Sequence, residues 1–104
     1  MNDVYLKAKK YIDFLREKGI SVSEAYLFGS YAKGNAKDWS DIDICVVSRN
    51  FGKDYFDEMV SLRKLAGFVD DRIEPHPFAE GDLDDPYSIL STEIRKYGVK
   101  IDVA

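Results

Sequence analysis

The stretch "LFGSYAKGNAKDWSDIDICVV", from Leu27 to Val47, places two carboxylates at the mouth of an apolar run. The run is rich in β-branched residues and is therefore expected to form a strand. Because side chains alternate along a strand, Asp41 and Asp43 share one face. Ile42 and Ile44 then point to the opposite face. The pattern predicts a strand that is buried in a core on one side and presents two acids on the other.

The remaining apolar periodicity alternates between helical and extended segments. The expected order is a helix capped by Asp3 and ending at Gly19, a strand (23–28), a short helix (30–34), the acidic strand (41–47), a helix capped by Asp54 (to 69), a strand (71–78), a helix starting at Asp85-Pro86 and ending at Gly98, and a short closing strand (99–104). Two prolines in the 71–78 segment favour an edge position for that strand. This order predicts an α/β (α+β) fold, a small mixed β-sheet with helices packed against it.

The size and charge of the chain narrow the classes of function. Its 104 residues fit one domain, residues 1–104. The net charge of -4 gives no general electrostatic attraction to nucleic acid, so direct nucleic-acid binding is not expected. No apolar run is long enough to cross a membrane, and the N-terminus lacks the apolar core of a signal peptide. We therefore expect a cytoplasmic protein that does not bind membranes.

The paired aspartates indicate a cation site when they are considered with the preceding loop. Neighbouring carboxylates repel each other unless a divalent cation lies between them, and oxygen ligands suit Mg²⁺ or Mn²⁺. An isolated Asp-x-Asp is more often a solvated strand end. Here, however, Gly29 and Ser30 follow an apolar strand directly, and their N–H groups and the Ser30 hydroxyl can bind a phosphate. A phosphate-binding turn next to metal-type acids predicts phosphate chemistry.

The segment "GSYAKGNAKDWSDIDI" resembles the Gly-Ser…Ser-Asp-x-Asp signature of polymerase-β-like nucleotidyltransferases. The short chain and "RIEPHPF" are similar to the minimal nucleotidyltransferases (MNT) that are paired with HEPN proteins. The resemblance implies that Gly29 and Ser30 cradle the β- and γ-phosphates of a nucleotide. Lys33 stands where relatives more often have arginine and is a further phosphate candidate. Ser40 is expected to orient the acidic strand, and a direct phosphate contact is the alternative.

The resemblance also implies a metal site with three catalytic carboxylates, Asp41, Asp43 and a third acid from a neighbouring strand. Glu74 is the candidate, because it lies in the next strand-like segment. An exposed strand residue without a role is the alternative for Glu74. Asp70 and Asp71 are nearby substitutes for the third acid, but they are more typical of turn residues.

Three other side chains near the motif allow more than one interpretation. His76 could orient Glu74 or touch a substrate, and a structural histidine is an equally good interpretation. Trp39 could stack on a base, but we expect a partly buried loop anchor. Cys45, the only cysteine, is expected to fill the core.

The activity implied by the resemblance is transfer of AMP from ATP, with two Mg²⁺ ions (or Mn²⁺ in their place) held by the acids. The expected acceptor is a tyrosine hydroxyl of a HEPN-type toxin, so the protein would be an antitoxin and could form a hetero-oligomer with that toxin. Two alternatives remain open. One is a nucleotidyltransferase for small molecules such as aminoglycosides, and the other is an idle antitoxin that acts by binding alone.

Overall fold

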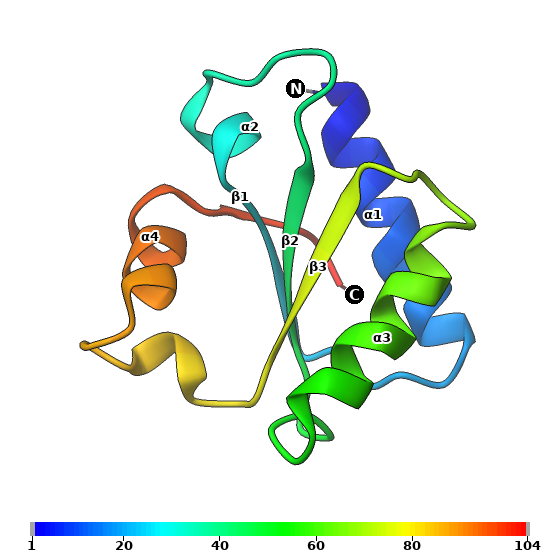
Figure 1. The fold of residues 1–104 in the computed structure, drawn as a ribbon, viewed down its shortest axis with the longest axis vertical. Helices are drawn as coiled ribbons and strands as arrows, with labels where there is room; N and C mark the ends of the chain where they lie inside the picture. The colour runs from blue at the N-terminus through cyan, green and yellow to red at the C-terminus, as the bar shows by residue number, and fades with distance from the viewer. Residues whose placement is uncertain (1, 104) are drawn as a thin grey trace.

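The computed structural model describes residues 2–103 (Figure 1). Its elements in chain order are α1 (Asn2–Glu17), β1 (Glu24–Phe28), α2 (Ser30–Lys33), β2 (Ile42–Val47), α3 (Tyr55–Ala66), β3 (Ile73–Phe78), the 3₁₀ helix η1 (Asp82–Asp84), α4 (Ile89–Tyr97) and β4 (Val99–Lys100). The expected alternation of helices and strands is confirmed, although the closing strand covers only Val99–Lys100 of the expected 99–104 and η1 was not expected. The expected mixed α/β class is confirmed as well.

The four strands form one sheet in the order β3-β2-β1-β4. β1 pairs antiparallel with β2 and with β4, whereas β2 and β3 run parallel. The parallel pair is joined by a crossover through α3, as parallel strands require. β3 lies at an edge, as Pro75 and Pro77 predict, because a proline has no N–H to donate to a second neighbour.

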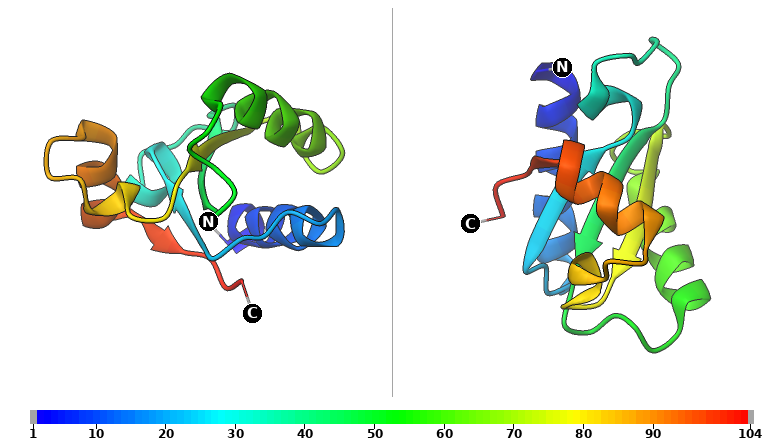
Figure 2. Two further views of the ribbon diagram at one scale, coloured as in Figure 1. Left: turned by 90° about the horizontal axis from the view of Figure 1, so that it is seen from below. Right: turned by 90° about the vertical axis from the view of Figure 1, so that its left-hand side faces the viewer.

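Helices cover both faces of the sheet. Figures 1 and 2 show α1 and α3 on one side of the strands and α4 on the other. The alternation of β2 explains the two cores. Ile42, Ile44 and Val46 are fully buried in the cluster that includes α1 and α3 side chains. Cys45 and Val47 belong to a second cluster, which includes Ile94 of α4.

The helices are short, and α1 is the longest with 16 residues. Its apolar positions lie on one face and are buried against the sheet, namely Val4, Ala8, Tyr11, Ile12 and Leu15. Its opposite face is charged, as expected for an amphipathic helix that covers a sheet. Within residues 2–103, none of the helices is both long and apolar enough to cross a bilayer.

Several helix ends differ from expectation, and one of them is the end of α3, which falls at Ala66 and not at 69. Asp54 caps α3 as expected, since its side chain accepts the N–H of Asp57. Gly19 has a φ of 88° just after α1 ends, also as expected. The cap at Asp3 is wrong, however, because α1 already begins at Asn2 and Asp3 lies in its first turn.

The expected start of the last helix at Asp85-Pro86 is also wrong. Asp85 Oδ1 accepts the N–H of Tyr87 at 2.9 Å and so closes a local turn instead of a helix. The helix begins after Ser88, whose Oγ accepts the N–H of Ser91 at 3.0 Å. Asp85 and Ser88, three positions apart, are both capping-type residues, and the later one starts α4.

Candidate active site

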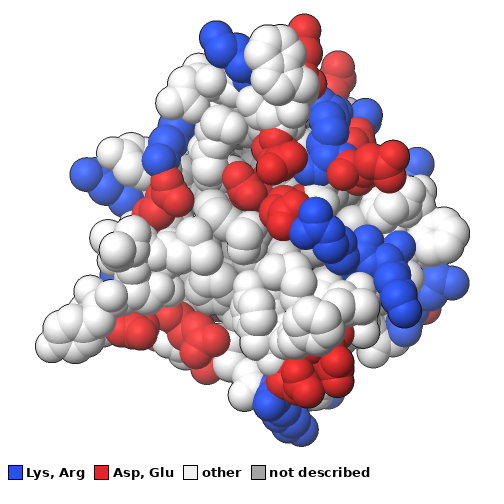
Figure 3. Space-filling model, viewed as in Figure 1, with Lys and Arg blue, Asp and Glu red and all other residues white. Residues whose placement is uncertain are grey.

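The two candidate acids Asp43 and Glu74 lie side by side on the parallel strands. They are register partners in the β2–β3 ladder, and Asp43 also faces Phe28 across the β1–β2 ladder. Their side chains are 25% and 26% exposed, so both are partly shielded but open to a ligand. Asp41 is exposed and lies one residue before β2, not within it as expected. Figure 3 shows acidic side chains gathered over the upper ends of β2 and β3.

Gly29 brings the turn after β1 into contact with the Asp43 carboxylate. Its φ of 74° and ψ of -150° are a combination that only glycine adopts freely. A Cβ on Gly29 would overlap the Asp43 carboxylate, and Oδ2 is the nearest atom. The missing side chain of Gly29 is therefore what allows the turn to lie directly on the acid. Ser30 follows at the start of α2.

Each of the two strand acids has a basic partner. Arg63 Nη1 of α3 donates to Glu74 Oε1 at 2.5 Å. This hydrogen bond raises the pKa of Arg63, and Asp41 makes a smaller contribution in the same direction. His76 Nε2 lies 3.3 Å from Asp43 Oδ1. His76 was expected either to orient Glu74 or to touch a substrate. In the structure it contacts Asp43 and not Glu74.

The donor chemistry fits a hard divalent cation, although the side chains do not form a ready-made ligand cluster. Three carboxylates, Asp41, Asp43 and Glu74, lie at one end of β2 and β3. Within the part of the chain that the structure describes, no three His, Cys, Asp or Glu side chains converge closely enough to hold a metal ion. Glu74 is instead engaged by Arg63. Carboxylate oxygens are the ligands that Mg²⁺ prefers, so the set fits in kind, and Glu74 would have to leave Arg63 to join it.

The two other nucleotide-binding candidates make structural contacts. The Lys33 ammonium forms an ion pair with Glu93 of α4, which raises the pKa of Lys33. It also lies 5.4 Å from the ring centroid of Tyr97. Ser40 Oγ accepts the N–H of Lys37 at 2.8 Å and so fixes the turn before Asp41. This contact agrees with the orienting role expected for Ser40.

The structure decides the expected burial of Trp39 and Cys45. Trp39 is 78% exposed, so the partly buried anchor is wrong. Cys45 is fully buried, as expected for a core residue. Asp71 is exposed at the turn before β3.

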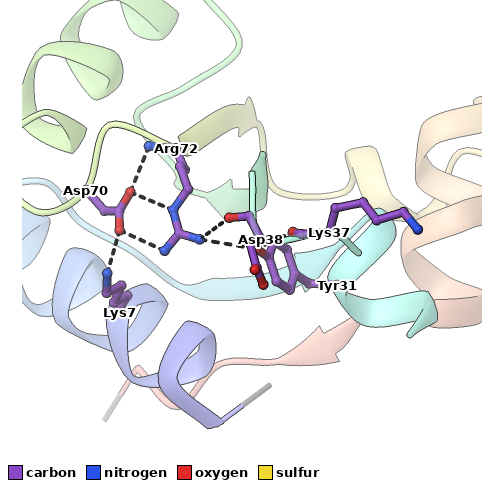
Figure 4. A network of polar contacts seen from close by, with 6 residues as sticks. All are labelled: Lys7, Tyr31, Lys37, Asp38, Asp70 and Arg72. Atoms are coloured by element: carbon purple, nitrogen blue, oxygen red, sulfur yellow. Dashed lines mark hydrogen bonds and ion pairs between the residues drawn. The ribbon is translucent and has the colours of Figure 1, made fainter. Parts of the chain in front are cut away.

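Asp70 belongs to a network that the sequence did not reveal. Its carboxylate bonds Arg72 and Lys7, and these partners, Arg72 foremost, hold the pKa of Asp70 well below its usual range (Figure 4). The same Arg72 reaches Tyr31 in α2. Arg63 stands in no recognisable motif, and Arg72 opens the segment "RIEPHPF" without any contact being predicted for it. Only the folded chain shows that both lie near the acids.

Comparison with known proteins agrees with this architecture. The family model described as "Nucleotidyltransferase domain" matches residues 8–103. A segment of 39 residues is 44% identical to "Putative protein adenylyltransferase MJ1305" of Methanocaldococcus jannaschii. That segment covers 38% of this chain and 26% of the relative.

Solved structures match nearly the whole chain. A putative nucleotidyltransferase from Sulfolobus solfataricus aligns with a TM-score of 0.70 and 25% identity, over 94% of this chain and 78% of that one. A toxin-antitoxin with AMP-PNP aligns with a TM-score of 0.68 and 26% identity, over 93% and 73%. The toxin-antitoxin MntA-HepT, at 23% identity and a TM-score of 0.63 over 95% and 72%, shares the fold.

The mixed sheet, its element order and its helical cover are those of an enzyme class that transfers nucleotidyl groups. The chain belongs to the nucleotidyltransferase domain family. The resemblance to minimal nucleotidyltransferases of toxin–antitoxin pairs is thereby confirmed at the level of family and fold.

Proposed function

We propose that this nucleotidyltransferase is a protein adenylyltransferase that moves AMP from ATP to a tyrosine hydroxyl of a HEPN-type toxin, with release of pyrophosphate, and so acts as its antitoxin. The contact between the Gly29 turn and the Asp43 carboxylate is the observation that carries the proposal. It supports the proposal because the turn proposed to bind phosphate lies next to an acid proposed to bind metal. The relative named as a protein adenylyltransferase and the toxin-antitoxin structure with AMP-PNP support the choice of nucleotide and acceptor.

The turn after β1 would receive the triphosphate. The N–H groups of Gly29 and Ser30, with the Ser30 hydroxyl, are donors of the kind that phosphate oxygens accept. A phosphate at this turn would lie next to Asp43, because the Gly29 backbone already touches that carboxylate. The turn and the acid would thus act on the same phosphate groups. Lys33 would have to leave Glu93 to assist them.

Asp41, Asp43 and Glu74 would hold two Mg²⁺ ions, or Mn²⁺ in their place. Bound ions of this kind neutralise charge on the phosphates and lower the pKa of an acceptor hydroxyl. Glu74 would be placed to take the proton of the acceptor. His76, 3.3 Å from Asp43, would steady that carboxylate, and Arg63 would be released from Glu74 as the ligand set forms. Most of the rate gain would come from positioning and charge compensation.

Nucleotide binding tests the metal requirement. Calorimetry with ATP should detect binding in the presence of Mg²⁺ and none after a chelator is added. Asp43→Asn should lose this binding and all transfer. Its melting temperature should equal or exceed that of the parent, because one of two neighbouring negative charges is removed. Asp71→Asn, which neutralises an exposed acid near the same end of β3, is the matched control and should bind normally.

A melting temperature of Asp43→Asn far below that of the parent would mean that Asp43 is structural. Equal ATP affinity with and without Mg²⁺ would rule out the proposed ion site.

The acceptor is tested by co-expression with the HEPN-type protein of a neighbouring reading frame. Intact mass spectrometry should show whole adenylyl units on that protein, and a Tyr→Phe scan should locate them. The units should disappear when Asp41 and Asp43 are both changed to Asn. If the double variant neutralises the toxin equally well and no mass is added, the protein inhibits by binding alone. Transfer to an aminoglycoside without labelling of the toxin would instead support a small-molecule transferase.

A further inference from the structure

The loop between α2 and β2 is tied down by side chains from two other parts of the chain. Residues 35–41 form this loop, which carries Ser40 and Asp41 into β2. Tyr31 Oη of α2 donates to the main-chain oxygen of Lys37 at 3.1 Å. Arg72 Nη1, just before β3, donates to the main-chain oxygen of Asp38, also at 3.1 Å. Both bonds hold the loop by its backbone, within four residues of Asp41.

Arg72 uses all three guanidinium nitrogens in this arrangement. Nε and Nη2 donate to the two Asp70 oxygens at 3.1 and 3.0 Å. Nη1 donates to Tyr31 Oη at 3.2 Å and also to the Asp38 carbonyl. Figure 4 shows the planar group between Asp70 on one side and the loop on the other. The main-chain oxygen of Arg72 also accepts the N–H of Ile42, at 2.8 Å, so the start of β2 is held by the same residue.

The network is also anchored to α1, through an ion pair between Lys7 and Asp70. Lys7 Nζ lies 2.7 Å from Asp70 Oδ2, and the Asp70 side chain is only 11% exposed. Hydrogen bonds from Arg72 and Lys7 hold the pKa of Asp70 well below its usual range. The hydrogen bond to Asp70 raises the pKa of Arg72 in turn. Asp70 and Arg72 therefore keep their charges across neutral pH.

The same guanidinium connects both halves of the proposed site. The first half is the Gly29–Ser30 turn that would bind phosphate, which Arg72 reaches through Tyr31, the residue after Ser30. The second half is the loop that delivers Asp41. We propose that Arg72 is a positioning residue for nucleotidyl transfer, which fixes the Asp41 loop relative to the Gly29–Ser30 turn. The inference rests on the proposed function, because it assigns both segments to one site.

Only a forked cation can make this set of contacts. A lysine at position 72 would keep the attraction to Asp70, but its point charge cannot also bond Tyr31 and the Asp38 carbonyl in the same plane. Loss of the fork would free the loop while leaving both cores intact. A misplacement of about 1 Å at a reacting group can cost about 100-fold in rate, so transfer should be far more sensitive than folding.

Arg72→Lys and Arg72→Gln test the proposal, with Arg95→Gln as the matched control. Arg95 also donates to main-chain carbonyls, those of Leu83 in η1 and Asp85, but in the segment before α4. Trp39 is the only tryptophan and lies in the loop, so its fluorescence anisotropy in the nucleotide-free protein reports the mobility of the loop directly. Hydrogen exchange of residues 35–42 gives a second measure. Transfer is measured as kcat and KM for Mg-ATP, and melting temperature follows the fold.

Both Arg72 variants should lower the anisotropy of Trp39, speed exchange in the loop and reduce kcat by at least about tenfold, with a smaller change in KM. Arg95→Gln should leave all these measurements at the parental level. Should Arg72→Gln fail to fold, Arg72→Lys still removes the fork while keeping the charge, and Tyr31→Phe removes only the hydroxyl that bonds Arg72 and the Lys37 carbonyl. Unchanged anisotropy and kcat in Arg72→Lys would overturn the proposal, since charge alone would then suffice. A parent without transfer activity would overturn the proposed function instead, and the loop measurements would decide whether Arg72 holds the loop.

Discussion

At the scale of single residues, the site depends on an atom that is absent from Gly29. Its backbone conformation is accessible to glycine, and the space next to its Cα is filled by the Asp43 carboxylate. Gly34, at the other end of α2, also has a positive φ, of 81°, but nothing lies within 4 Å of where its Cβ would be. A side chain at Gly34 would therefore meet backbone strain alone, whereas a side chain at Gly29 would meet backbone strain and also clash with the Asp43 carboxylate.

Gly29→Ala should lower both stability and activity. The backbone conformation alone costs about 1–3 kcal/mol for a residue with a side chain, and Asp43 must also move away. Gly34→Ala should cost about 1 kcal/mol from its left-handed backbone and should leave Mg-ATP binding intact. Urea denaturation and calorimetry measure the two effects. Normal nucleotide binding by Gly29→Ala would show that the contact with Asp43 is dispensable.

At the scale of elements, local side-chain caps decide where α4 begins. Asp85 and Ser88 both accept a backbone N–H, but only the Ser88 bond lies at the end of the helix. Ser91, whose N–H Ser88 accepts, is buried and also donates to the main-chain oxygen of Asp82. The start of α4 is therefore tied to η1. The helix α4 in turn supplies Ile94 to the second core.

Ser88→Ala should destabilise the protein by about 1 kcal/mol, the usual cost of losing an N-cap. Asp85→Ala should cost less than about 0.5 kcal/mol, because it removes a turn bond on the surface. The free energy of unfolding in urea compares the two variants. A larger loss for Asp85→Ala would place the functional start of the helix at the earlier residue.

At the scale of the whole molecule, the sheet separates two cores, and the single thiol reports on one of them. Cys45 is fully buried beside Phe28 and Phe78 in the cluster that includes α4. Burial, and secondarily the nearby Glu24, raises the pKa of the Cys45 thiol to about 12. The thiolate, which is the reactive form, is therefore scarce in the folded protein as well as inaccessible.

Cys45 should react with a maleimide only when the protein unfolds. Raising the pH from about 7 to about 9 should leave labelling of the native protein slow, since this range stays below the raised pKa. Denaturant should make labelling immediate. A Cys45→Ala variant carrying Ser61→Cys on the exposed face of α3 is the control and should label at once. Fast native labelling at Cys45 would mean that α4 opens without global unfolding.

The ion pairs of Asp70 with Lys7 and Arg72 should make the stability of the protein depend on pH. The pKa of Asp70 is lowered in the folded state, so its stabilisation is complete above the ordinary value of 3.8 and is lost as the pH falls toward the lowered pKa. Asp70→Asn should be less stable by about 1–3 kcal/mol at neutral pH, and the difference should shrink below about pH 4.

Denaturation of both proteins across the pH range measures this difference. Asp13→Asn removes the exposed partner of Lys9 and should change stability by less than about 0.5 kcal/mol. A constant difference between Asp70→Asn and the parent down to pH 2 would contradict the lowered pKa.

The sequence by itself determined the elements, their order and the face on which each strand residue lies, because these follow from local periodicity and from proline and glycine chemistry. These local patterns put Asp43 and Glu74 in consecutive strand segments, and Pro75 and Pro77 favoured an edge for β3. That the two acids lie on neighbouring strands was implied by the family resemblance and was decided by the fold. The side-chain partners were decided only by the tertiary structure. Arg63 contacts Glu74 from α3, where no motif marks it, and Arg72 of "RIEPHPF" gained its partners only in the folded chain. Trp39 is exposed, although a partly buried loop anchor was expected. Contacts between residues far apart in the chain depend on how α1, α3 and the sheet pack together, and no local pattern encodes that packing.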